Sequence, residues 1–340
     1  MTSDSPIFIF GSPRSGTSLL SQIIGSHSRI GVPFESLLYT TFYPWLRWYG
    51  NLAVPSNRRR LAADMLSTDV MRNWTGLPGL EEVLAAVHRP DFHGVFAAIM
   101  STWAQARGKP RWGEKSPWHA FYWREIRAGF PDARIVHIVR DGRDATLSWK
   151  RARQGPRHVY PLARRWVDYL ELMREVRAAW PAGAFLELRY EDLLDAPGQV
   201  VRGLCDFLGE TFEPGMLLFH EAAVHYPTDP RNRTNLLRPL MQDNKQKWRT
   251  RMSPRELRIT EAVAGPTLAR YGYKPALESP EIPRAELLAI RWLENPPLRA
   301  YGMLRNTQGL SEALQNLRIY LRLRLRPARA GNTATSAEGI

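Results

Sequence analysis

A strand, a glycine-containing turn and a helix near the start of the chain constrain its fold more than any other feature. Residues 7–10 are apolar and favour β-structure, so they predict a buried strand, and the leucine and isoleucine spacing of residues 19–24 predicts a helix. The turn between them, residues 11–18, reads GSPRSGTS. A helix that begins after such a turn presents unpaired N–H groups and the positive end of its dipole. These features suit an anion, most often a phosphate.

The turn is similar to the phosphate-binding loop of nucleotide hydrolases, with one informative difference. Thr17 stands where those proteins have the lysine that reaches the β- and γ-phosphates. A triphosphate is therefore a poor fit. A donor with a single 5′-phosphate fits better, held by backbone N–H groups, by the hydroxyls of Thr17 and Ser18, and by the forked guanidinium of Arg14.

Residues 13–19, with the sequence PRSGTSL, resemble the 5′-phosphosulfate loop of the sulfotransferases that use 3′-phosphoadenosine 5′-phosphosulfate (PAPS). The most similar pattern is that of tyrosylprotein sulfotransferases and related bacterial enzymes, whose loop reads R-S-G-T-T-L. The resemblance implies a bacterial-type enzyme with a P-loop-like fold. It also implies that the donor is bound by Arg14, Ser15, Gly16, Thr17 and Ser18.

The charge of the chain restricts its partners without selecting one. The 340 residues are 44% apolar, which is enough to bury a full core in one large domain, with or without an appendage. The formal net charge of +14 implies anionic partners. A nucleic-acid binder, a membrane-surface protein and an enzyme for a multiply phosphorylated cofactor would all satisfy it.

The single cysteine, Cys205, excludes an internal disulfide and leaves no cysteine cluster for zinc. It lies in an apolar helical stretch, so we expect a buried and unreactive thiol. No run approaches the roughly 18 apolar residues that a spanning helix needs, and residues 1–6 lack the features of a signal peptide. The expectation is a soluble cytoplasmic protein.

Glu35 is the first candidate for a catalytic base. A lone glutamate is ordinarily solvated or caps a helix. Glu35, however, lies 19 residues after Gly16, which matches the position of the proposed base in tyrosylprotein sulfotransferases. A carboxylate beside the donor could accept the proton of an attacking hydroxyl.

Lys115 and His119 provide a second catalytic pattern. Lys115 is expected at the carboxyl end of a short strand, where open α/β sheets hold their ligands. The resembled family has K-[TDS]-P here, which implies a lysine near the bridging oxygen of the donor. Cytosolic small-molecule sulfotransferases use a histidine as base in the spacing Lys-x-His. Here the spacing is Lys-x-x-x-His, so His119 is the second candidate for the base.

Arg140 and Ser148 match the family's 3′-phosphate motif, in which a serine follows an arginine by eight residues. Arginine supplies a bidentate charged contact and serine a short hydroxyl donor. A dinucleotide-binding fold would have glycines here, so the Rossmann alternative fails. The family often has a further arginine twelve residues after the first. That position is Ala152 here, and either Arg151 or Arg153 could substitute for it.

Two later segments complete the resemblance, which extends over residues 6–275. Residues 189–193 read RYEDL, and the resemblance places Tyr190 against the adenosine end of the donor, although a buried core tyrosine is the alternative. In the late K-W segment, Trp248 would anchor a loop over the donor and Lys247 would reach its phosphates. The family serine that precedes this lysine by about fifteen residues is Asn232 here, so we do not expect that contact.

The acceptor is the least constrained part of the prediction. The aromatic-rich segment 37–49 is a candidate for an acceptor wall or a lid, although core packing suits any single ring better. Residues 50–110 continue with helical patterns and are expected to set the choice of acceptor. A small molecule, a glycan or a peptide would each be compatible.

We expect a sulfotransferase domain at 1–275, a basic helical extension at 276–330 and a disordered tail at 331–340. Leucines at 310, 314, 317, 321 and 325 form a helical stripe, whereas residues 321–326 alternate like a strand. The extension could pack on the domain, form a homodimer, or contact an anionic membrane.

The combined prediction is an α/β fold with a parallel sheet of four or five strands flanked by helices. The resemblance implies sulfuryl transfer from PAPS to a hydroxyl or an amine, with Glu35 as base and with Arg14 and Lys115 offsetting charge. No metal is expected, because the side chains supply the positive charge. A P-loop small-molecule kinase is the alternative within the fold, disfavoured by Thr17. A basic nucleic-acid or membrane-binding protein is favoured only by the net charge.

Overall fold

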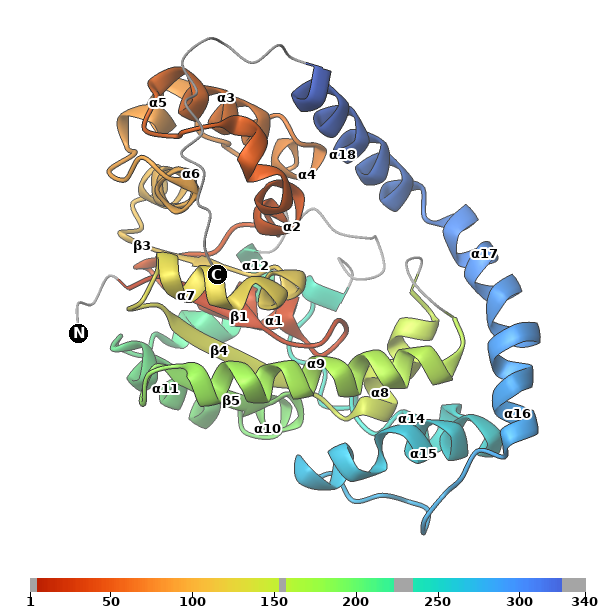
Figure 1. Ribbon diagram of the computed structural model, residues 1–340. Helices are drawn as coiled ribbons and strands as arrows, with labels where there is room; N and C mark the ends of the chain where they lie inside the picture. The colour runs from red at the N-terminus through yellow and green to blue at the C-terminus, as the bar shows by residue number, and fades with distance from the viewer. Residues whose placement is uncertain (1–4, 153–156, 223–234, 326–340) are drawn as a thin grey trace.

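The computed structural model describes residues 5–152, 157–222 and 235–325. Its centre is a five-stranded sheet in the order β2-β3-β1-β4-β5 (Figure 1), and every neighbouring pair is parallel. The strands are β1 (Ile7–Phe10), β2 (Ile30–Gly31), β3 (Arg111–Glu114), β4 (Arg134–Val139) and β5 (Phe185–Arg189). This confirms the predicted α/β class and parallel sheet.

The position of β1 at the middle of the sheet determines where the motifs meet. Ile7 lies opposite Gly113 of β3 on one side and opposite Arg134 of β4 on the other. Because the strands run parallel, the segments that follow β1, β3, β4 and β5 all leave from one edge of the sheet. Open α/β sheets bind their ligands at this edge.

Parallel strands need crossover connections, and helices supply them here. The helices of the sheet region are α1 (Thr17–Gly25), α6 (Phe92–Gln105), α7 (Trp123–Gly129), α8 (Gly142–Lys150), α9 (Val159–Ala179), α10 (Tyr190–Asp195), α11 (Pro197–Leu208) and α15 (Pro254–Arg270). Between β2 and β3 lie also α2 (Leu38–Phe42), α3 (Pro55–Leu66), α4 (Asp69–Arg72) and α5 (Leu80–Ala85). The short helices α12 (Phe219–Ala222) and α14 (Trp248–Arg251) follow β5 and α11.

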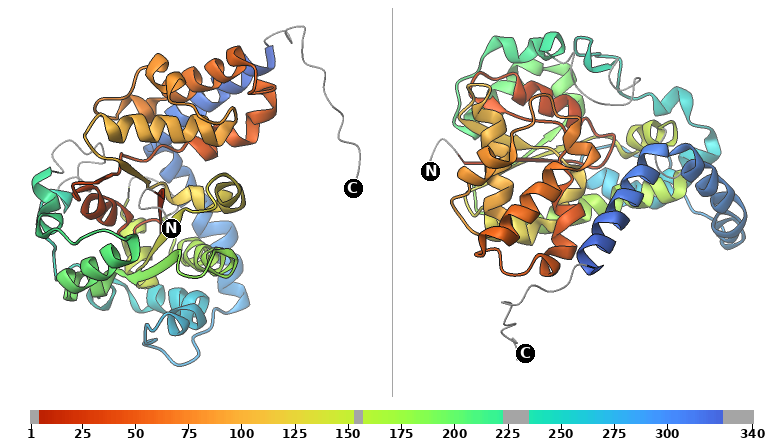
Figure 2. Two further views of the ribbon diagram at one scale, coloured as in Figure 1. Left: turned by 90° about the vertical axis from the view of Figure 1, so that its left-hand side faces the viewer. Right: turned by 90° about the horizontal axis from the view of Figure 1, so that it is seen from above.

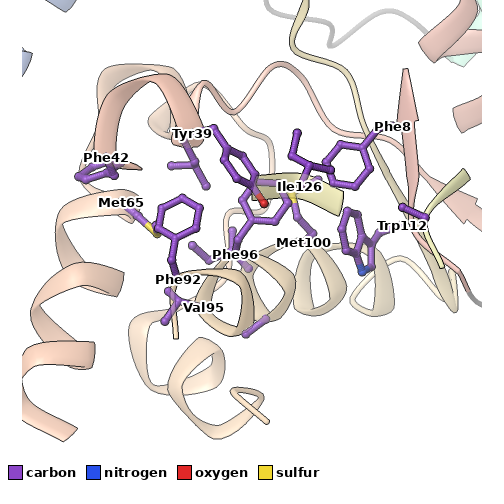
Figure 3. Packing of buried hydrophobic residues seen from close by; sticks show 14 of the residues in the cluster. Phe8, Tyr39, Phe42, Met65, Phe92, Val95, Phe96, Met100, Trp112 and Ile126 are labelled. Carbon is purple, nitrogen blue, oxygen red and sulfur yellow. The ribbon is translucent and has the colours of Figure 1, made fainter. Parts of the chain in front are cut away.

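Both faces of the sheet are covered, which explains why its strands are apolar without interruption. Phe8 and Phe10 point to one side, into a cluster with α6, α7 and α9. Ile7 and Ile9 point to the other, into a cluster with α1 and α11. Figure 3 shows the first cluster, where Phe8 packs against Trp112 of β3 with ring centroids 5.9 Å apart.

The aromatic segment 37–49 belongs largely to this core. Tyr39, Phe42 and Tyr49 are at most 1% exposed and belong to one core cluster with α3 and α6. Figure 3 shows Tyr39 and Phe42 in this cluster. Core packing is therefore the correct interpretation for these three rings, and they form neither a lid nor an open wall. Tyr43 and Trp45 are only half-buried.

Several predicted boundaries shift in the structure. The sequence predicts helices at 159–179, 197–208 and 254–273. The first two are confirmed at both ends, and the third ends at Arg270 instead of Tyr273. The helix expected from about Asp144 begins earlier, at Gly142, because the Asp141 side chain caps it by accepting a hydrogen bond from the Arg143 N–H at 2.9 Å.

The C-terminal region forms an arm that leaves the end of α15 and returns to α3 and α4 (Figures 1 and 2). It consists of α16 (Arg284–Ala289), a π-helical turn at 290–294, α17 (Asn295–Arg305) and α18 (Thr307–Leu325). The predicted extension is thus helical, and residues 321–325, whose pattern suited a helix or a strand, are part of helix α18. The expected tail at 331–340 lies outside the described residues.

The end of the arm is fastened to the main body. Ile319 and Leu323 are buried in the core cluster next to α3. Arg322 forms an ion pair with Asp64 at 3.0 Å, and the Asp69 N–H donates to the Gln315 side chain at 3.1 Å. Within the described part of the chain, no helix has both the length and the apolar composition to cross a membrane.

The structure predicts that Cys205 is chemically inert in the folded protein. Its thiol is buried on α11, and this burial raises the pKa to about 11. Only the thiolate reacts, so alkylation by iodoacetamide near neutral pH should be more than about a hundredfold slower in the native protein than in denaturant. Mass spectrometry of samples quenched at successive times measures the labelling rates of the native and the denatured protein. Fast labelling of the native protein would contradict the buried position.

Candidate active site

The turn after β1 has the backbone geometry of an anion-binding loop. Arg14 and Gly16 both have positive φ, at +74° and +99°, and Gly16 caps the first turn of α1. Backbone that alternates in this way turns successive N–H groups toward one concave side. Glycine is required at position 16 for a second reason, since an added Cβ would lie 2.5 Å from the ring of Tyr190.

Some polar atoms in and beside this loop are buried and have no hydrogen-bond partner in the described part of the chain. The Ser12 and Ser15 hydroxyls and the Nε of Arg140 are inaccessible to water and make no hydrogen bond within the described residues. Buried polar groups are normally satisfied, and each exception calls for an explanation. A phosphorylated ligand in the loop would supply acceptors to all three, so the residues present fit such a group.

Lys115 and Glu35 meet at the start of α1. The Lys115 ammonium, completely buried at the end of β3, lies 2.5 Å from a Glu35 carboxylate oxygen and donates to the Ser18 hydroxyl at 3.2 Å. The Glu35 side chain is 26% exposed, so it can be reached from outside. Three residues from separate segments are thereby brought to one point beside the loop.

Glu114 holds the segment that carries Glu35. Its buried carboxylate accepts hydrogen bonds from the Ser36 hydroxyl at 3.0 Å and from the Ser116 hydroxyl at 2.5 Å. His119 contacts it through Nδ1 at 3.1 Å. Burial acts to raise the pKa of Glu114, but the His119 ring and these hydrogen bonds outweigh burial and hold the pKa below its ordinary value. The sequence offered no signal for Glu114 beyond its place beside Lys115.

His119 is engaged through both ring nitrogens. Its Nε2 accepts a hydrogen bond from the Tyr39 N–H at 3.3 Å, which leaves the ring proton on Nδ1, facing Glu114. The side chain is completely buried. Through these contacts it supports the segment from Ser36 to Tyr39, which directly follows Glu35.

Arg140 and Ser148 both meet Arg14. The Arg140 guanidinium donates to the Arg14 carbonyl at 3.1 Å, and the Arg14 Nε donates to the Ser148 hydroxyl at 3.1 Å. The two residues of the R-x-x-x-x-x-x-x-S motif are thus joined through the loop. Arg151, at the end of α8, is exposed, whereas Arg153 lies outside the described residues.

Tyr190 packs between the loop and Arg140. The Arg140 guanidinium lies 4.4 Å from the centre of its ring, and its hydroxyl accepts a hydrogen bond from the Asn244 amide at 2.8 Å. Asn244 also accepts a hydrogen bond from Arg140 through its carbonyl, at 2.8 Å. Asn244 was absent from the predicted site, because no motif residue marks it.

The K-W segment folds over the start of α8. Trp248 is buried, its backbone N–H donates to the Asp144 carboxylate at 2.8 Å, and the Arg143 guanidinium lies 3.8 Å from the centre of its ring. Lys247 is half-buried at the start of α14, and within the described residues its ammonium makes no hydrogen bond or ion pair. Asn232 lies outside the described residues.

Tyr169 of α9 is a further residue that the sequence did not identify. Its buried hydroxyl accepts a hydrogen bond from the Gly11 N–H at 3.1 Å and donates to the Pro117 carbonyl at 2.9 Å. It therefore ties the start of the anion-binding loop to the segment after Lys115. Tyrosine inside an amphipathic helix is common in cores, so nothing in its local pattern indicates this position. In the described ranges, no group of three His, Cys, Asp or Glu side chains could hold a metal ion.

Comparison with known proteins agrees with this geometry. The model of the sulfotransferase family matches residues 6–214. An uncharacterized protein of Aquifex aeolicus is 25% identical over 289 residues, which is 82% of this chain and 34% of that protein. An omega-hydroxy-beta-dihydromenaquinone-9 sulfotransferase of Mycobacterium tuberculosis is 26% identical over 244 residues, 61% of this chain and 63% of that protein.

The chain thus spans about a third of the first of these relatives and less than two thirds of the second. Among solved structures, the sulfotransferase domain from the curacin biosynthetic pathway shares the fold. It has a TM-score of 0.52 and 20% identity, and the match covers 80% of this chain and 98% of that domain. The chain belongs to the sulfotransferase family.

Proposed function

We propose that this protein transfers a sulfuryl group from PAPS to a hydroxyl or an amine of an acceptor. The observation that carries the proposal is the meeting of Glu35, Lys115 and Ser18 at the first turn of α1. It combines a base, a buried cation and an anion-binding helix start within hydrogen-bond distance of one another. The mycobacterial relative is named for a substrate with a hydroxyl group, which supports a hydroxyl acceptor here.

The donor would be held along the edge of the sheet. Its 5′-phosphosulfate would occupy the loop at Arg14, Ser15, Gly16, Thr17 and Ser18. Its 3′-phosphate would meet Arg140 and Ser148, and its adenosine end would meet Tyr190. The Arg140 Nε and the Ser15 hydroxyl support this arrangement, because neither has a hydrogen-bond partner among the residues that the structure describes. Lys247 would approach the phosphates from the segment that covers α8.

The donor supplies a sulfur that the acceptor oxygen or nitrogen attacks, with cleavage of the bond to the 5′-phosphate oxygen. Glu35 accepts the proton of the attacking group. Lys115 and Arg14 stabilise negative charge on the departing phosphate, and the complete burial of Lys115 strengthens its interaction. The engaged ring of His119 favours Glu35 as the base and gives His119 a positioning role.

The acceptor would approach from the side of Glu35, because its carboxylate is the exposed end of the Glu35–Lys115 pair. The half-buried rings of Tyr43 and Trp45 and the helices of residues 50–110 lie on this side of the sheet, so they are our candidates for acceptor recognition. Small molecules, glycans and peptides all offer suitable hydroxyls. We place the reaction in the cytoplasm and assign no nucleic-acid partner.

The direct test is incubation with PAPS, EDTA and a library of hydroxyl and amine compounds, followed by mass spectrometry. We expect products that are heavier by one SO₃ group, together with adenosine 3′,5′-bisphosphate. Transfer from ATP that requires magnesium would instead indicate the kinase alternative and refute the proposal.

Replacing the base gives the first kinetic prediction. Glu35→Gln removes the proton acceptor but keeps the shape of the side chain, so kcat should fall by at least about a hundredfold while PAPS affinity is retained. His119→Gln should lower kcat less. Glu281→Gln, at an exposed position, is the control. A nearly unchanged rate for Glu35→Gln together with an inactive His119→Gln would reverse the assignment.

Binding of the product nucleotide tests the 3′-phosphate contact. Arg140→Ala should weaken adenosine 3′,5′-bisphosphate by about 2–4 kcal/mol in calorimetry, as for a lost charged hydrogen-bond partner, and should barely affect AMP. Arg164→Ala, on the exposed side of α9, serves as the control. Equal losses for both ligands would mean that Arg140 only supports the loop.

Glu114 should act through the position of Glu35. Glu114→Gln removes the charge that orders Ser36, Ser116 and His119, so kcat should fall about ten- to a hundredfold with little change in affinity for adenosine 3′,5′-bisphosphate. Glu210→Gln is the matched control, because this buried carboxylate pairs with Arg111 far from Glu35. If Glu114→Gln lowers thermal stability as much as Glu210→Gln does and leaves kcat unchanged, Glu114 has only a structural role.

A further inference from the structure

The C-terminal arm concentrates exposed apolar side chains. Eleven of the seventeen large apolar side chains that the described residues expose lie on it, between Leu288 and Leu325. They include Trp292 and Leu304, which are 66% and 77% exposed. Monomeric soluble proteins rarely expose contiguous apolar patches of this kind without a binding function.

Helix α18 has two apolar faces with different surroundings. Because 3.6 residues make one turn, Ile319 and Leu323 lie on one side, buried against the main body. Five leucines on the opposite side of the helix are 44–79% exposed and form what we call the leucine stripe, namely Leu310, Leu314, Leu317, Leu321 and Leu325. The ion pair of Arg322 with Asp64 fixes this orientation. The stripe is therefore exposed because the helix is fastened on its other side.

Arginines border the leucine stripe. Residues 295–325 contain five arginines, no lysine and one carboxylate residue. At helical spacing, Arg318 lies on one side of the stripe and Arg324 on the other. Arg318 makes no ion pair within the described residues, and it lines a cavity of about 280 Å³ together with Arg72 and Arg322. Leu314 borders the same cavity, as does Asp69, the carboxylate that pairs with Arg72 at 3.7 Å.

We propose that the outer face of α17 and α18 binds the surface of an anionic lipid bilayer. The leucine stripe would enter the boundary between head groups and acyl chains, and the bordering arginines would contact lipid phosphates. Arginine suits this position because its long apolar stem packs beside the leucines while its charge remains at the head groups.

Charge complementarity selects a bilayer over a second copy of the chain. In a dimer built on the leucine stripe, the arginine borders of both copies would approach each other with few carboxylates to pair with them. An anionic lipid surface neutralises the same arginines. The arm would lie in the plane of the surface, with its buried side still on the main body.

Co-sedimentation with vesicles tests the proposal on the full chain. We expect the protein to bind phosphatidylcholine vesicles that contain phosphatidylglycerol, to bind pure phosphatidylcholine much less, and to dissociate in high salt. The triple variant Leu314→Glu/Leu317→Glu/Leu321→Glu should lose at least about tenfold in apparent affinity. Because these side chains are 44–54% exposed, the thermal unfolding midpoint should change little.

Matched controls separate this effect from general changes of charge and polarity. Leu218→Glu alters a leucine that is 50% exposed outside the arm and should leave vesicle binding unchanged. Arg318→Glu/Arg324→Glu should weaken binding to anionic vesicles, whereas Arg174→Glu on α9 should have a smaller effect.

Three results would overturn the proposal. The first is a wild-type protein that does not sediment with anionic vesicles, and the second is equal loss in the Leu218→Glu control. The third is a wild-type dimer in analytical ultracentrifugation that the triple leucine variant converts to a monomer, since the leucine stripe would then be an interface between copies.

Discussion

The parallel pairing of β1 with both β3 and β4 is the constraint on which the rest of the structure depends. It sends the segments after these strands, at 11–18, 115–117 and 140–148, to one edge of the sheet. Each segment alone is a short turn with a few polar groups. Together they form a site whose parts are held by a sheet that is buried on both faces. Such a sheet is a rigid scaffold for a binding site.

The electrostatics of this edge depend on basic side chains that are buried beside the loop, each with a carboxylate near it. Lys115 and Arg140 are at most 6% exposed, and Arg14 lies between Arg140 and Ser148. Removing charges from water is costly unless partners compensate them. Glu35 pairs with Lys115, and Asp144 lies near enough to Arg140 for their charges to interact. A phosphorylated donor would add negative charge on the side of Arg14.

Two glutamates near Lys115 differ through their surroundings. Glu114 is enclosed by hydrogen-bond donors from Ser36, Ser116 and His119, so its charge is fully used in holding the segment. Glu35 is one residue before that segment and keeps an exposed side. Environment, and not residue type, separates a carboxylate that positions from one that can accept a proton.

The sequence by itself determined the α/β class, the turn after β1 and the motif that contains Arg140 and Ser148. It could do so because strand composition, helix periodicity and motif spacing are local patterns. It left open the surroundings of Glu35 and His119, the aromatic rings and the form of residues 321–325. The tertiary structure decided these: the His119 side chain is completely buried, whereas the Glu35 side chain is 26% exposed. The Tyr39 N–H donates a hydrogen bond to His119 Nε2, and the ring of Tyr39 is buried in the core. The hydrogen bond joins residues that lie 80 positions apart, and it forms only once the helices have packed on the sheet. Local patterns carry no record of such partners, whereas packing determines them.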